Sequence, residues 1–190
     1  MPVTFSKASI DYVGLLNTVV QKYHGHLKEC EVRICLMMAQ AARNEHGEVI
    51  APALKLHGVE CYAIASVIPY KQRAAGAADV RIDVDADKWE NMTADERIAL
   101  LDHELTHFEL QYDGEGNLKS DDSGRPKVKI RPHDFDVGWF HSIAAKHGDA
   151  SLEVQQAKLF ADENGQLYWG WSSPPDRDIE TAKLGKNPDA

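Results

Sequence analysis

The sequence predicts an α+β fold in which a small mixed or antiparallel sheet packs on helices. Three observations support this class. Apolar residues recur at helical spacing over residues 9–23, strand-like alternation follows in several segments, and a second helical pattern begins at Thr93. With 190 residues, 43% of them hydrophobic, the chain is long enough for one well-packed domain. We expect this domain over residues 1–171, followed by a loosely ordered tail over residues 172–190.

The first part of the chain is expected to form one helix and three strands. The helix begins at Ser9 and ends near Tyr23. Its apolar face is expected to comprise Ile10, Val13, Leu15 or Leu16, Val19 and Val20. Strands are predicted over residues 31–38, 59–68 and 80–84, where apolar and β-branched residues are frequent. These strands would form the sheet.

The second helix is predicted from Thr93 to about Gln111. Thr93 and Glu96 have the spacing of a capping box, in which each side chain bonds a backbone N–H of the first turn. Gly114 and Gly116 follow and are expected to end the helix. Its apolar stripe is formed by Ile98, Leu101, Leu105 and Phe108.

This helix carries His-Glu-Leu-Thr-His at residues 103–107. At about 3.6 residues per turn, His103 and His107 lie on one face and can bind a single metal ion. Glu104 would stand beside the metal and could take a proton from a water whose pKa the metal lowers. The pattern is typical of zinc hydrolases, although a chance match on a solvated helix face is the plain alternative.

A catalytic zinc site needs a third protein ligand, and residues 131–141 are the downstream segment that combines His, Asp and aromatic residues. His133 is the leading candidate, and Asp136 and His141 are the alternatives. Asp134 is a candidate for orienting a ligand imidazole instead. A helix is predicted from about residue 134 to His147, ended by Gly148.

Turn-forming residues separate short apolar segments in the rest of the chain. Residues 109–132 are expected to form two short strands with turns, and the alternation over 127–131 is typical of a charged edge strand. Near the C-terminus, Asn164–Gly165 between residues 159–161 and 167–169 predicts a hairpin.

Composition argues against several classes of protein. The formal net charge of −9 disfavours general nucleic-acid binding, because phosphate neutralisation requires a basic surface. No apolar run of membrane-spanning length and no secretory signal are evident, so we expect a cytoplasmic protein without a membrane partner. The three cysteines, Cys30, Cys35 and Cys61, show no C-x-x-C spacing, which argues against a disulfide framework and a cysteine zinc site.

Several of these residues together resemble a known family. They are Asp79-Val80-Arg81-Ile82, Trp89, the run from Ala99 to His107, His133-Asp134 and Lys146-His147-Gly148. The pattern is similar to that of the putative phage metallopeptidase family. The resemblance implies a compact zincin-like domain encoded by a phage or prophage, and hence a bacterial host cell. It also implies zinc bound by His103, His107 and His133, Glu104 as the base, and residues 80–84 as the edge strand that lines the substrate cleft.

The function favoured by the sequence is zinc-dependent hydrolysis of peptide bonds, with Glu104 assisting the attack of water and a peptide or protein as substrate. Tyr112 and His141 are the two candidates for stabilising the oxyanion. Two alternatives remain. The chain could be a non-catalytic, zinc-stabilised binding or regulatory protein, or a metal-dependent amidase acting on cell-wall peptides.

Overall fold

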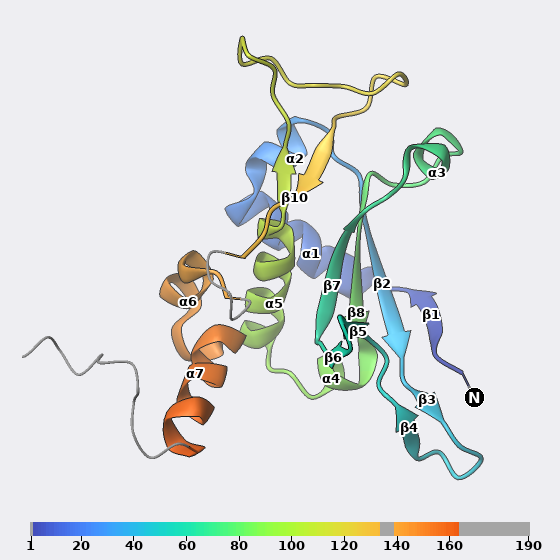
Figure 1. Ribbon diagram of the computed structural model, residues 1–190, viewed down its shortest axis with the longest axis vertical. Helices are drawn as coiled ribbons and strands as arrows, with labels where there is room; N and C mark the ends of the chain where they lie inside the picture. The colour runs from blue at the N-terminus through green and yellow to red at the C-terminus, as the bar shows by residue number, and fades with distance from the viewer. Residues whose placement is uncertain (1, 134–138, 164–190) are drawn as a thin grey trace, which may run out of the picture.

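A computed structural model describes residues 2–133 and 139–163 and has a mixed α+β architecture (Figure 1). Its main sheet has four strands in the order β1-β2-β8-β7. β2 and β8 are parallel, whereas β1 and β7 run antiparallel to their neighbours. These strands are β1 (Thr4–Lys7), β2 (Ile34–Gln40), β7 (Ala63–Val67) and β8 (Val80–Asp85). The sheet is therefore small and mixed, as predicted.

The strand expected at the edge of the sheet lies inside it. β8 pairs with β2 on one side and with β7 on the other, so the assignment of residues 80–84 as the edge strand was wrong. Val80, Ile82 and Val84 face the core, and Asp83 on the opposite face is also buried, where it pairs with Arg81. A strand buried on both faces is typical of the inside of a sheet. The edge strand next to the helices is β7.

Helices α1 (Ile10–Tyr23) and α5 (Ala94–Thr106) lie on one side of this sheet (Figure 1). Ser9 caps α1 as expected, with its side chain accepting a hydrogen bond from the backbone N–H of Tyr12. The predicted apolar face was wrong in part. Leu16, Val19 and Val20 are buried, but the Ile10 side chain is 87% exposed.

The main hydrophobic core lies between the sheet and these two helices. Trp89 is fully buried at its edge, where its ring meets that of Tyr12 at 5.4 Å between centroids. Its other buried members include Leu16, Val19, Leu36, Val80, Ile82, Leu101 and Leu105. Leu101 and Leu105 lie on the side of α5 that faces the core. His103 and His107 therefore lie on another side of the helix.

α5 begins as predicted but ends earlier. Both hydrogen bonds of the capping box between Thr93 and Glu96 are present. The helix stops at Thr106, and residues 108–110 form β9 (Phe108–Leu110), which pairs with β10 (Val128–Ile130). The prediction of helix as far as Gln111 was therefore wrong, because pairing with β10 satisfies the backbone of this segment. The predicted strand pair within residues 109–132 is confirmed.

The remaining elements before α5 are short. Residues 42–60 form two hairpins, and a second, smaller apolar cluster lies around Ala39 and Leu54. They consist of β3 (Ala42–Arg43), β4 (Val49–Ala51), β5 (Lys55–Leu56) and β6 (Val59–Glu60). The short helices are α2 (Gly25–Glu29), α3 (Tyr70–Ala74) and α4 (Ala86–Glu90). The three cysteines are free thiols.

The C-terminal part of the described chain is helical, and two predictions for it need correction. α6 (His141–His147) ends before Gly148 as predicted but begins only at His141, and residues 134–138 of the predicted helix lie outside the described residues. A 3-10 turn, η1 (Gly148–Ala150), leads to α7 (Leu152–Glu163). Residues 159–161 belong to α7 and not to a hairpin strand. The rest of that hairpin and the predicted tail over 172–190 lie outside the described residues. Within the described ranges, no helix is both long and apolar enough to cross a membrane.

Candidate metal centre

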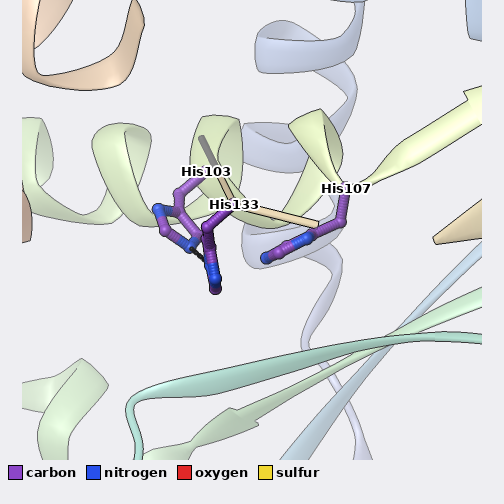
Figure 2. A group of neighbouring side chains, drawn as sticks. All are labelled: His103, His107 and His133. Carbon is purple, nitrogen blue, oxygen red and sulfur yellow. Dashed lines mark hydrogen bonds between the residues drawn. The ribbon is translucent and has the colours of Figure 1, made fainter. Parts of the chain in front are cut away.

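His103 and His107 project from one side of α5, and His133 reaches the same place from the segment after β10 (Figure 2). One potential ligand atom from each of the three residues lies within 4.8 Å of the others. The Nε2 atoms of His103 and His133 are 3.2 Å apart. Neighbouring nitrogens around a tetrahedral metal with bonds of about 2.0 Å would be about 3.3 Å apart. The arrangement therefore fits a metal ion held by three imidazoles.

The hairpin β9–β10 brings His133 to α5. Ile130 pairs with Phe108, so the residue after β10 returns to the end of the helix. There the backbone N–H of Arg131 donates to the carbonyl of His107 at 2.7 Å, and Nδ1 of His107 donates to the carbonyl of Arg131 at 2.8 Å. These two hydrogen bonds hold Arg131 beside His107, and His133 follows Arg131 by two residues. The separation of 26 residues along the chain is thus closed by strand pairing.

These contacts also orient the imidazole of His107. Because Nδ1 donates to a carbonyl oxygen, Nε2 carries the free lone pair and can face a metal. Burial lowers the pKa of His107 to about 4, so the ring is neutral at neutral pH. A neutral imidazole is the form that binds metals.

His103 is oriented by a residue that the sequence did not identify, Glu153 of α7. Nδ1 of His103 lies 2.6 Å from Oε1 of Glu153, whose residue is only 3% exposed. Burial acts to raise the pKa of Glu153, but the hydrogen bond to His103, the charge of His103 and the backbone N–H of Phe140 together lower it. The carboxylate is therefore the acceptor, Nδ1 is the donor, and Nε2 of His103 is directed to the other side.

Glu104 lies between this site and the edge strand β7. Its residue is 4% exposed, and the backbone N–H of Ala65 lies near enough to its carboxylate to favour the charged form. Burial raises the pKa of Glu104 to about 7, although the neighbouring His103 acts in the opposite direction. A carboxyl group with such a pKa can accept and return a proton near neutral pH.

Phe140 forms an apolar wall against the three imidazoles. It is fully buried, and its ring centroid lies 4.8 Å from those of His103 and His107 and 4.9 Å from that of His133. The guanidinium of Arg131 lies over the same ring at 5.2 Å. The sequence pointed to the aromatic segment around this residue but gave no reason to single it out.

The role of Asp102 was also not predicted from the sequence. This residue lies on the other side of α5 from the clustered histidines. Its buried carboxylate accepts hydrogen bonds from His24 at 2.6 Å and from Lys146 and His147 at 2.7 Å each. Burial acts to raise the pKa of Asp102, but these three donors together lower it well below the ordinary value. The carboxylate joins α5 to the end of α1 and to the last turn of α6.

The other sequence candidates do not gather at the three histidines. His141 is an exposed residue at the start of α6 and is not part of the histidine group. Asp134 and Asp136 lie outside the described residues. Tyr112 is 51% exposed and lines a cavity of about 390 Å³ with His24 and His26, to which none of the three clustered histidines contributes.

Comparison with known proteins gives one match. The family model described as "Putative phage metallopeptidase" matches residues 3–162, which include every element from β1 to nearly the end of α7. No curated protein and no solved structure matches the chain. The matched region contains the three histidines, Glu104 and Glu153. By the extent of this match, the chain belongs to the putative phage metallopeptidase family.

Proposed function

We propose that this protein is a zinc-dependent peptidase, with His103, His107 and His133 as the metal ligands and Glu104 as the general base. The observation that carries the proposal is the convergence of three imidazoles within 4.8 Å next to a buried carboxyl group of raised pKa. Three histidine ligands with one position left for water are a known arrangement of catalytic zinc. Membership of a metallopeptidase family supports the same reaction class.

Glu104 would move the proton in this reaction. Zinc, when bound, supplies a Lewis acid that lowers the pKa of a water molecule to about 7 and polarises the scissile carbonyl. The Glu104 carboxylate accepts the proton from the attacking water and returns it to the leaving amine. The backbone N–H of Ala65 favours the charged carboxylate beside the edge strand, where the substrate backbone would lie.

Among the described residues, no strand pairs with the outer edge of β7, which supports an extended peptide as the substrate. The backbone of Tyr62 bonds Asp85 and that of Ile68 bonds Asp79, so the even-numbered residues of this segment pair with β8. In an antiparallel pair the intervening residues direct their N–H and C=O groups the other way. Ala63, Ala65 and Val67 therefore direct backbone groups to the sheet edge; the N–H of Ala65 faces Glu104, and the other groups are where a peptide could add as a strand.

A cavity next to the start of β7 could receive a side chain of such a peptide. It has a volume of about 390 Å³, and Tyr62, which precedes β7, is part of its wall. Leu152, which precedes Glu153 in α7, also lines it. The cavity thus adjoins both the edge strand and the helix that contacts His103.

The proposal is tested with Glu104→Gln, which keeps the size of the side chain but removes the base. The matched control is Glu109→Gln, because Glu109 is exposed and forms a surface ion pair with Lys129. Wild type, variant and control would be loaded with zinc and incubated with a protein digest and, separately, with peptidoglycan fragments. New termini would be detected by mass spectrometry.

We expect zinc in all three proteins, cleavage of peptides by wild type and control, and a loss of at least about 100-fold in the Glu104→Gln rate. Equal cleavage by Glu104→Gln would contradict the assigned base. Cleavage of the peptidoglycan fragments alone would replace peptidase activity with amidase activity on cell-wall peptides.

A further inference from the structure

We propose that Glu153 is a positioning residue of the metal centre, and that α7 is therefore a required part of the site. This inference rests on the proposed function, since it assigns a role toward the metal held by His103. Glu153 would fix the ring orientation of His103, keep its proton on Nδ1 and strengthen Nε2 as a ligand. It would touch neither metal nor substrate.

The first argument is the geometry of the pair. Oε1 of Glu153 lies 2.6 Å from Nδ1 of His103, the nitrogen that points away from His133. Ligand histidines commonly donate their second ring N–H to a carboxylate, which fixes the tautomer and raises the basicity of the ligand nitrogen. His107 is already held in the same way by the carbonyl of Arg131. With Glu153, both helix ligands have a fixed orientation.

The second argument is that the pair is a poor device for stability alone. The side chains of His103 and Glu153 are only 14% and 3% exposed. Burial of a carboxylate costs solvation that one hydrogen bond to an imidazole repays only in part, and apolar residues of similar volume are often at least as stable in place of a buried charged pair. A carboxylate at this position is better explained by what it does to the imidazole.

The third argument is that the same carboxylate contacts the apolar wall of the site. The backbone N–H of Phe140 donates to Oε1 of Glu153 at 3.5 Å, and the Phe140 ring packs on all three imidazoles. Glu153 thus contacts one ligand directly and helps to hold the residue against which the other two pack.

The local sequence explains how α7 presents this residue. The hydroxyl of Ser151 accepts from the backbone N–H of Val154, as an N-cap does, which places Glu153 in the first turn of the helix. Gln155 then joins α7 to the start of α5 through a 2.9 Å hydrogen bond to Glu96. The first turn of α7 therefore contacts α5 at two places, at Glu96 near the start of the helix and at His103 near its end.

The inference is tested with full-length Glu153→Gln and Glu153→Ala, and with Lys158→Gln as the control on the same helix. Lys158 is an exposed residue that forms an ion pair with the exposed Asp149. Two quantities would be measured on protein whose circular dichroism matches that of wild type. They are the zinc dissociation constant, by competition with a chelator, and the visible absorption spectrum of the cobalt-substituted protein.

We expect zinc affinity to fall by about 10- to 100-fold in Glu153→Ala. It should fall less in Glu153→Gln, whose amide oxygen can still accept from Nδ1, and stay unchanged in Lys158→Gln. The cobalt spectrum of Glu153→Gln should differ from that of wild type, because the ligand field reports the orientation of His103. A merely structural role would not change this spectrum in a folded variant.

The two proposals fail in different ways. Wild-type affinity and cobalt spectra in folded Glu153→Gln would overturn the role of Glu153, while leaving zinc binding and hydrolysis by wild type intact. A wild-type chain that takes up no metal would overturn the proposed function and this inference together. Loss of affinity in Lys158→Gln equal to that in Glu153→Gln would also overturn the inference, since it would show a general sensitivity of α7.

Discussion

The carboxylate of Asp102 accepts a hydrogen bond of 2.7 Å from Nε2 of His147, although the two residues are 45 positions apart. Asp102 directly precedes the first of the clustered histidines, and its other oxygen accepts from His24. The helix that carries the metal site is therefore held from behind by the end of α1 and by the last turn of α6. The turn of α5 that binds α1 and α6 through Asp102 is therefore also the turn that carries His103.

Asp102→Ala should destabilise the fold strongly. The substitution leaves His24, Lys146 and His147 without their acceptor, and removing one partner of a buried charged network costs about 3 kcal/mol or more. Chemical denaturation would show the loss in the free energy of unfolding. Asp95→Ala is the control, because Asp95 lies exposed at the start of the same helix. A loss no larger than that of the control would show that the network contributes little to stability.

Thr93→Ala should cost about 1 kcal/mol, because the Thr93 hydroxyl accepts from the backbone N–H of Glu96 and caps α5. For a chain of this size the melting temperature should fall by about 3 °C. Thr18→Ala is a suitable control, since the Thr18 hydroxyl bonds a carbonyl within α1 and caps no helix. Equal melting temperatures for wild type and Thr93→Ala would contradict a stabilising role of the cap.

Acid should weaken the same cap through Glu96. Hydrogen bonds from Thr93 lower the pKa of Glu96 below its ordinary value of 4.5. A carboxyl group whose pKa is lower in the folded state stabilises that state above the ordinary pKa, and this contribution is lost as the pH falls through the lowered value. The difference in unfolding free energy between wild type and Glu96→Gln should therefore shrink below about pH 4.5. Denaturation curves from pH 7 to pH 3 measure it, and a difference that stays constant would refute the linkage.

Local sequence patterns predicted the residues that α5 contributes to the site, but they did not predict where the helix ends. The capping box and the four-residue spacing of His103 and His107 are properties of one helix, so they could be inferred from neighbouring residues. The end of that helix was misjudged because Phe108 suits the helical stripe as well as the buried face of a strand. Pairing with β10 decides between these structures, and that partner lies far along the chain.

The same limit explains the contacts that were missed. Glu153 reaches His103 across 50 residues, and nothing in the residues around Glu153 indicates an imidazole partner. The order of the strands in the sheet likewise depends on pairing between segments that are distant in the sequence. The alternating Val80, Arg81 and Ile82 gave the pattern of a half-exposed strand, but Arg81 pairs with a buried Asp83 inside the sheet. Local patterns of this kind predict where helices and strands occur better than they predict which of them pair or pack together.

Metal content should separate the three candidate third ligands. His133 is part of the histidine cluster, whereas His141 is an exposed residue of α6, so His133→Ala should lose the metal and His141→Ala should keep it. His107→Ala provides the positive control for loss, because it removes a ligand from α5 itself. Elemental mass spectrometry of the purified proteins after zinc reconstitution gives the stoichiometry. Near-stoichiometric zinc in His133→Ala would exclude this residue as the third ligand and return Asp136 to consideration. Loss in His133→Ala, with retention in His141→Ala, would show that the hairpin β9–β10 delivers the third ligand by fixing Arg131 beside His107.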